Sequence, residues 1–165
     1  MPTRRLFLAF SIVLLGVKIA AADCTQPPGP SVDWSRCLVN GRDLSGHDFT
    51  ASRLVEASFP RATLNRVILT NVNGYRAKFI SASMIEAVLD GGSFPDADLT
   101  KADLSGASLK NADFRRARFF ATNLARADLS GAKMERADLT GANLSGTRWI
   151  DGERICAEGS IGQCN

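Results

Sequence analysis

The sequence predicts a repeat fold, because one five-residue pattern runs through most of the 165 residues. Every fifth residue from Leu44 to Trp149 gives 22 positions, of which twelve are Leu, six are Phe and two are Met. Two residues before these positions Ala occurs 14 times, and only Phe120 among the Leu, Phe and Met residues of this stretch lies outside the register. A period of five fits neither an α-helix nor a β-strand, so we expect one short unit repeated along the chain.

The clearest stretch of the pattern, Ala97–Leu99 through Ala142–Leu144, resembles the A-(D/N)-L-x-x repeat of the pentapeptide-repeat family. The resemblance covers residues 42–151 and extends weakly back to Trp34 and Val39. It implies an all-β fold, a right-handed four-sided β-helix solenoid with one repeat per side and four per coil. The 22 repeats then give about five and a half coils, a rod roughly 26 Å long at a spacing of about 4.8 Å per coil.

In this fold the central residue of each repeat, position i, points inward and stacks on the residue 20 positions away. The residue at i−2 also faces inward beside the corner, where only a small side chain fits, and the other three positions face solvent. Gly74 occupies a central position and Val72 the i−2 position of the same repeat. We interpret this exchange as compensation, in which the larger side chain of Val72 replaces core volume that is missing at Gly74. Gly92, one coil above Val72, would leave space for that larger side chain.

Residues 1–22 have the features of a cleaved export signal. Arg4 and Arg5 precede an apolar core of 12 residues, Leu6–Val17, and the small residues Ala20–Ala22 precede the expected cut. A span of about 20 residues is needed to cross a bilayer, so we expect no stable membrane insertion after cleavage. The sequence favours general secretion over the twin-arginine route, and localisation in a bacterial periplasm or outside the cell.

Removal of the signal leaves a chain with no net charge, because the signal holds three of the 20 Lys and Arg residues and none of the 17 Asp and Glu residues. A neutral protein has no overall field that attracts nucleic acid or anionic membrane. Some members of the family are acidic rods that mimic DNA and interact with topoisomerases. That alternative function is disfavoured by the neutral charge and by the signal peptide, and we expect no nucleic-acid partner.

The two ends are expected to be caps, formed by residues 23–41 and 152–165 around the repeats. Trp34 and Trp149 lie on the register at its two limits, where a large ring can cover the core. Four cysteines in an exported chain predict disulfides. Bridged Cα atoms lie within about 7 Å, and the ends of the implied rod are farther apart, so the expected pairs are Cys24–Cys37 and Cys156–Cys164. A metal site is the disfavoured alternative, since there is one histidine and no CxxC motif.

Residues 20 apart on one face should form charge ladders. One ladder contains Lys78, Asp98, Arg118 and Asp138, another contains Glu56, Arg76, Asp96, Arg116 and Arg136, and Glu135 lies over Arg115. Two surfaces are candidates for a protein partner or for self-association. The first is an outward apolar cluster at one edge, Ile68, Ile85 and Val88, and the second is a basic patch, Arg115, Arg116, Arg118 and Arg126.

The sequence does not favour an enzyme. The single histidine, His47, occupies an i−2 position near the N-terminal end and is interpreted as a capping or packed residue. The cysteines are used in disulfides. Seven aspartates face outward, but a convex rod offers no pocket that would raise a carboxyl pKa. We therefore expect no catalytic residues, no metal and no cofactor, and predict a structural or protein-binding scaffold.

Overall fold

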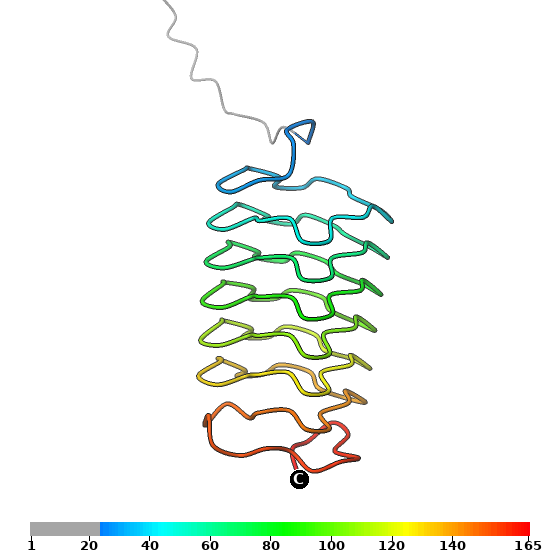
Figure 1. Ribbon diagram of the computed structural model, residues 1–165, viewed down its shortest axis with the longest axis vertical. Helices are drawn as coiled ribbons and strands as arrows, with labels where there is room; N and C mark the ends of the chain where they lie inside the picture. Colours follow the sequence, from blue (N-terminus) through cyan, green and yellow to red (C-terminus); the bar gives the residue numbers. More distant parts are fainter. Residues whose placement is uncertain (1–23) are drawn as a thin grey trace, which may run out of the picture.

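The structure, a computed structural model, describes residues 24–165, so the expected signal peptide, residues 1–22, lies outside the described residues. The described chain forms a straight stack of similar coils (Figure 1). Parallel β-bridges join residues exactly one coil apart, 20 positions along the chain, from Asp33 with Arg53 to Asp128 with Arg148. Each repeat contributes one bridge residue and no continuous strand. The first bridge residue, Asp33, lies inside the segment 23–41 that was expected to be a cap.

Each coil has four faces, which we number in chain order. The central core residues define them: face 1 contains Trp34, Leu54, Gly74, Phe94, Phe114 and Met134; face 2, Val39, Phe59, Phe79, Leu99, Phe119 and Leu139; face 3, Leu44, Leu64, Met84, Leu104, Leu124 and Leu144; face 4, Phe49, Leu69, Leu89, Leu109, Leu129 and Trp149. On every face the bridge residue is at position i−1 and points outward.

The corners are tight turns. The N–H of Cys37 donates to the carbonyl of Trp34 at 3.0 Å, and the same bond recurs every five residues from His47 with Leu44 to Gly152 with Trp149. The residue just before the donor, at i+2, has a positive φ throughout the repeats, for example 60° at Arg36 and 62° at Gly41. A positive φ at the third position is the requirement of a type II turn, which fits the corners from Leu44 to Leu144.

The core consists of the central residues and, from Ser52 onward, the residues at i−2, as predicted, whereas the i−2 residues of the first coil, Arg42 and His47, are exposed. The Phe59 and Phe79 rings stack at 5.2 Å, and the Phe94 and Phe114 rings stack at 5.3 Å. Gly74 has a different role from the one expected. A Cβ at Gly74 would lie 2.3 Å from Cδ1 of Phe94, and a Cβ at Gly92 would lie 2.4 Å from Cε2 of the same ring. The Phe94 ring, and not Val72, therefore fills the space of both missing side chains.

The preference for Asp or Asn at i−1 has a structural cause. The N–H at i+1 has no backbone partner in the described coils, and every Asp or Asn at i−1 accepts a hydrogen bond from it. In two repeats where Ser58 and Ser93 stand at i−1, the i+1 residue is Pro60 or Pro95, which has no N–H. The side chain thus satisfies a donor that the coil leaves unpaired.

The N-terminal end is closed by a disulfide and an aromatic side chain. Cys24 is bonded to Cys37 with a Cα–Cα distance of 5.6 Å. Trp34 is buried and packs edge-on against Phe49 with ring centroids 5.2 Å apart. The guanidinium of Arg42 lies 5.8 Å from the Trp34 ring centroid. The prediction that Trp34 covers this end of the core is confirmed.

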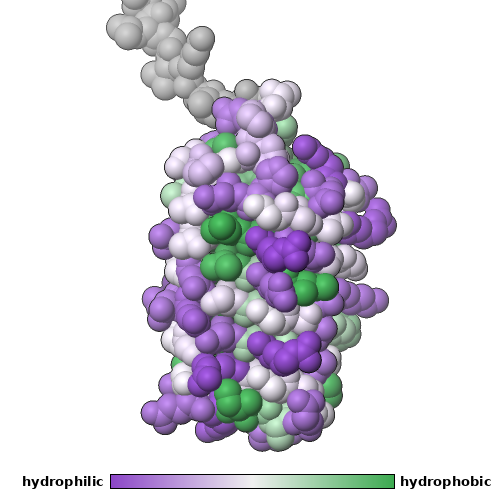
Figure 2. Space-filling view, viewed as in Figure 1, coloured by the Kyte–Doolittle hydropathy of each residue, from purple (hydrophilic) through white to green (hydrophobic). Residues whose placement is uncertain are grey.

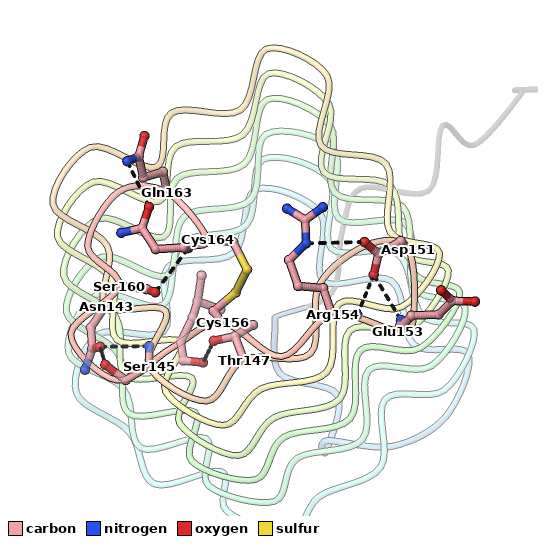
Figure 3. Close-up of a disulfide and its surroundings, with 12 residues drawn as sticks. Asn143, Ser145, Thr147, Asp151, Glu153, Arg154, Cys156, Ser160, Gln163 and Cys164 are labelled. Atoms are coloured by element: carbon pink, nitrogen blue, oxygen red, sulfur yellow. Dashed lines mark hydrogen bonds and ion pairs between the residues drawn. A yellow bond between two sulfur atoms is a disulfide. The ribbon is translucent and has the colours of Figure 1, made fainter.

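The C-terminal end is covered over two faces (Figure 3). The segment after the last repeat forms antiparallel bridges from Ile161 to Asn143 and from Ile155 to Arg148. Cys156 is bonded to Cys164 with a Cα–Cα distance of 4.8 Å, which confirms the predicted pairing. Faces 1 and 2 receive no such cover, and Met134, Ala137 and Leu139 are only partly buried there. Trp149 is also partly buried at this end.

Across residues 24–165, no helix has the length and apolar character needed to cross a membrane.

Candidate functional site

The three apolar residues of the predicted edge cluster lie around the corner between faces 3 and 4. Ile68 and Val88 are bridged to each other on neighbouring coils of face 4. Ile85 lies at the end of face 3, three residues before Val88, and is 37 % exposed. Its N–H donates to Oδ1 of Asn65 in the preceding coil at 3.0 Å, so its backbone position is fixed. The structure therefore brings the predicted cluster together.

Apolar side chains elsewhere on the surface do not form one large patch. Figure 2 shows one side of the rod, on which purple and white predominate and the green areas are small and separate. The large hydrophobic residues that are exposed within residues 24–165 are Leu38, Ile85, Phe120, Ile150, Ile155 and Ile161. A small contiguous cluster on such a surface marks a possible contact site more clearly than scattered side chains do.

The four arginines of the predicted basic patch are not brought together. Arg115, Arg116 and Arg118 lie at the corner between faces 1 and 2. Arg126 is ten residues beyond Arg116, two faces farther along the coil, and so occupies the opposite corner. The patch is corrected to three arginines, because a coil of four five-residue sides separates residues ten apart as far as the cross-section allows.

These three arginines are engaged in ion pairs. Arg116 binds Asp96 through two hydrogen bonds, Nε to Oδ1 at 2.8 Å and Nη2 to Oδ2 at 2.9 Å. Arg118 lies 3.8 Å from Asp98. Arg115 pairs with Asp113 of its own repeat at 2.6 Å, instead of with Glu135 in the next coil as the ladder predicted. Half-exposed pairs of this kind contribute at most about 1 kcal/mol each.

A shallow cavity of about 310 Å³ lies on face 2, and charged side chains line it. Its lining residues are Arg76, Lys78, Asp96, Ala97, Asp98, Arg116 and Arg118. Ala97 is the buried i−2 residue at its floor, and the charged residues belong to three neighbouring coils. Cations of the upper and lower coils flank the two carboxylates of the middle coil, and the hydrogen bond from the Arg116 guanidinium lowers the pKa of the Asp96 carboxyl.

The outward aspartates have the opposite character from catalytic acids. Hydrogen bonds from the Ser45 hydroxyl and N–H lower the pKa of Asp43, and those from Thr50 and Thr140 lower the pKa values of Asp48 and Asp138. His47 is exposed on the first coil, where no earlier coil covers it, and is therefore not packed. Among the described side chains, no group of three His, Cys, Asp or Glu residues is placed to hold a metal ion.

These hydrogen bonds predict a loss of stability in acid. Since the carboxyl pKa values of Asp43, Asp48 and Asp138 are lower in the folded chain than the ordinary value, the unfolded state binds more protons at low pH. The stabilisation is present above the ordinary Asp value of about 3.9 and is lost as the pH falls through the folded pKa values. Urea unfolding measured from pH 7 to pH 2 should show this decline.

The matched variant replaces all three residues, Asp43→Asn, Asp48→Asn and Asp138→Asn. Asn keeps an oxygen that can accept the N–H at i+1 and does not titrate. We expect the variant to fold at pH 7 and to lose less stability in acid than the unchanged chain. An identical acid dependence of the two proteins would show that these carboxylates are not responsible.

The comparison with known families agrees with the repeat geometry. The sequence profile described as pentapeptide repeats (8 copies) matches residues 35–71, 77–116 and 117–148, which make up more than half of the chain. The chain belongs to the pentapeptide-repeat family. No curated protein sequence matches this pentapeptide-repeat protein.

Solved structures of pentapeptide-repeat proteins are similar to the chain. One is from the thylakoid lumen of Arabidopsis thaliana, with 24% identity, TM-score 0.45, and coverage of 76% of this chain and 85% of that chain. A second is Rfr23 from the cyanobacterium Cyanothece, with 22% identity, TM-score 0.41 and coverage of 72% and 88%. A third is QnrB1, a plasmid-mediated fluoroquinolone resistance protein, with 19% identity, TM-score 0.43 and coverage of 70% and 66%.

Proposed function

We propose that this pentapeptide-repeat protein is a non-enzymatic scaffold that binds another protein outside the cytoplasm. The observation that carries the proposal is the outward cluster of Ile68, Ile85 and Val88 on a rigid corner of the rod. The repeat accepts polar or small residues at these positions elsewhere in the rod, so the coil does not require their apolar character. Departures from a regular pattern of this kind are where function is expected.

The compartment is inferred from the cysteines and the N-terminal sequence. Both disulfides join nearby residues at the ends of the repeats, and stable disulfides form in oxidising compartments. The export signal in residues 1–22 supports the same location, and the periplasm or the cell exterior follows for a bacterial protein. We propose general secretion as the route.

A catalytic role and a DNA-mimicking role have less support. The carboxylates with shifted pKa values are held in the ionised form, which gives no proton donor near neutral pH. DNA presents an unbroken row of negative charge, whereas the middle ladder of face 2 alternates in sign from coil to coil, at Lys78, Asp98, Arg118 and Asp138. Such a surface does not resemble the phosphate backbone.

The test is a triple variant, Ile68→Thr, Ile85→Thr and Val88→Thr, together with site-specific photo-cross-linking. Thr suits solvent-facing strand positions, so the variant should keep its circular dichroism spectrum and its thermal stability. A photo-reactive residue next to the corner, at Ser105, should form one discrete protein adduct in intact cells, and the triple variant should lose it. An equivalent probe at Asn123, in the middle of face 3, is the control.

Two outcomes would contradict the proposal. The first is an adduct of the same identity and yield in the folded triple variant. The second is the absence of any discrete adduct from Ser105 in the unchanged protein. An adduct whose mass is that of a second copy would identify the partner as this chain itself.

A further inference from the structure

Face 2 has features that the proposed corner contact does not use. It holds the cavity of about 310 Å³. It also ends in Phe120, which is 42 % exposed and is the one Leu, Phe or Met residue between 44 and 149 that lies outside the repeat register. Its outward side chains form three columns that run along the rod: Glu56, Arg76, Asp96, Arg116 and Arg136; Ser58, Lys78, Asp98, Arg118 and Asp138; Pro60, Ile80, Thr100, Phe120 and Thr140.

We propose that face 2 is a self-association surface, through which two copies of this chain pair with their rods antiparallel. The middle column carries the argument. From one coil to the next its charges are positive, negative, positive and negative, at Lys78, Asp98, Arg118 and Asp138. This order is complementary to its own reverse. An antiparallel second copy can therefore face every charge of the column with an opposite one.

The register follows from a twofold axis that lies between the two faces and crosses the rods midway between Asp98 and Arg118. Lys78 then faces Asp138 of the second copy, and Asp98 faces Arg118 of the second copy. Because both ladders have the same spacing of about 4.8 Å per coil, the match holds along the whole column. In the first column the same axis places Asp96 opposite Arg116 of the second copy.

The twofold axis doubles each contact, which gives six facing pairs of opposite charge. One like pair remains, Arg76 with Arg136 of the second copy, also doubled, and it lies toward the ends of the patch. The same charges disfavour an in-register parallel arrangement, since it would place Lys78 against Lys78, and Arg118 against Arg118. Facing like charges select against a register, so the column specifies one orientation.

The third column adds apolar area to the contact. The twofold axis places Phe120 against Thr100 of the second copy, and Ile80 against Thr140 of the second copy. Aromatic side chains are common anchors in protein interfaces. Lys78, which has no ion pair within residues 24–165, gains a carboxylate partner at the edge of the cavity.

The contact is small. The coils of face 2 from Glu56 to Arg136 span roughly 20 Å along the rod. A patch of that length is smaller than a standard interface, which buries about 800 Å² per partner. The dimer is therefore weak and exchanges readily. Its ion pairs are partly exposed, so salt near 1 M, where the screening length falls to about 3 Å, should dissociate it.

Zero-length carbodiimide cross-linking of the purified, disulfide-intact protein tests the arrangement directly. In one copy Lys78 and Asp138 are three coils apart, about 14 Å, so an amide bond between them can form only between copies. The experiment mixes isotopically labelled and unlabelled protein. We expect a mixed-label peptide that links Lys78 to Asp138, in low salt and not in 1 M salt.

Charge variants supply the second readout, which is sedimentation. Asp98→Arg places like charges across the contact and should raise the dimer dissociation constant at least about tenfold. Adding Arg118→Asp restores opposite charges between copies, although it leaves like charges next to one another along each column, and should recover the dimer. Asp103→Arg on face 3 makes the same change of charge outside the contact and should have no effect.

Three results would overturn the proposal: a protein that stays monomeric at all concentrations, a folded double variant that does not recover the dimer, or a mixed-label link from Lys133 to Asp33. The last would place the contact on face 1. The charges of that face would also meet opposite charges in an antiparallel copy, but its middle positions, Asn73 and Ser93, are neutral. The threonine variant of Ile68, Ile85 and Val88 should keep the Lys78–Asp138 link, which separates this contact from the corner site.

Discussion

Leu104→Asp should prevent the chain from folding into a stable β-helix. Leu104 is fully buried on face 3, where its side chain stacks between Met84 and Leu124 of the neighbouring coils. A carboxylate there would have no partner and would be cut off from water. An uncompensated buried charge is among the most costly substitutions, and we expect a loss of at least about 4 kcal/mol, measured by urea unfolding followed by circular dichroism.

Asp103→Asn, one residue earlier, is the matched control. Asp103 points outward, where its Oδ1 accepts hydrogen bonds from the Ser105 N–H at 3.0 Å and from Nδ2 of Asn123 at 3.0 Å. Asn keeps an acceptor oxygen, so the change in unfolding free energy should stay within about 0.5 kcal/mol. Comparable losses in the two variants would show that the inward and outward positions are wrongly assigned.

Gly74→Leu should destabilise the protein, although it restores the residue that the repeat prefers. The Phe94 ring occupies the space that a side chain at Gly74 would need, with Cδ1 only 2.3 Å from the position of the added Cβ. Overpacking of a filled core costs about 1–3 kcal/mol, and we expect the upper end of that range. Met84→Leu also restores the preferred residue, but meets no such clash and should cost less than about 1.5 kcal/mol.

Phe94→Leu provides the decisive partner for this variant. Alone it removes the ring from the space beside Gly74 and Gly92, which leaves a void and should cost about 1–2 kcal/mol. Combined with Gly74→Leu, the new side chain can fill that void. In a double-mutant cycle, the loss of unfolding free energy in the double variant should therefore be smaller than the sum of the two single losses by at least about 1 kcal/mol. Strict additivity would mean that the ring does not compensate for Gly74.

The five-residue register predicted a repeat with apolar central residues, and the family resemblance implied the β-helix and its stacking of residues 20 apart. The disulfide pairing also followed, because a rod keeps its ends apart. The compensation at Gly74 could not be assigned from spacing alone. It depends on the direction of the Phe94 ring, which leans across two columns, whereas the sequence pattern points only to Val72 in the same repeat.

The role of the outward aspartates was also missed, since alternation of charge alone marks them as solvated. A signal was available: Pro60 and Pro95 stand at i+1 in two of the four repeats in which Ser replaces the acceptor at i−1, which indicates an N–H that must otherwise be satisfied. For the surface, the pattern placed Ile68, Ile85 and Val88 correctly at one corner. It grouped Arg126 with Arg116 because they are close in sequence, although a coil with four sides puts residues ten apart at opposite corners.

We infer that the chain is an exported β-helix closed at each end by its own disulfide. Peptide mapping without reduction, on protein isolated from the cells that produce it, tests this claim most directly. The account predicts an N-terminus at Asp23, one peptide pair joined by Cys24 and Cys37, another joined by Cys156 and Cys164, and no free thiol. A chain that retains residues 1–22 with reduced cysteines, or a bridge that joins one end of the rod to the other, would contradict it.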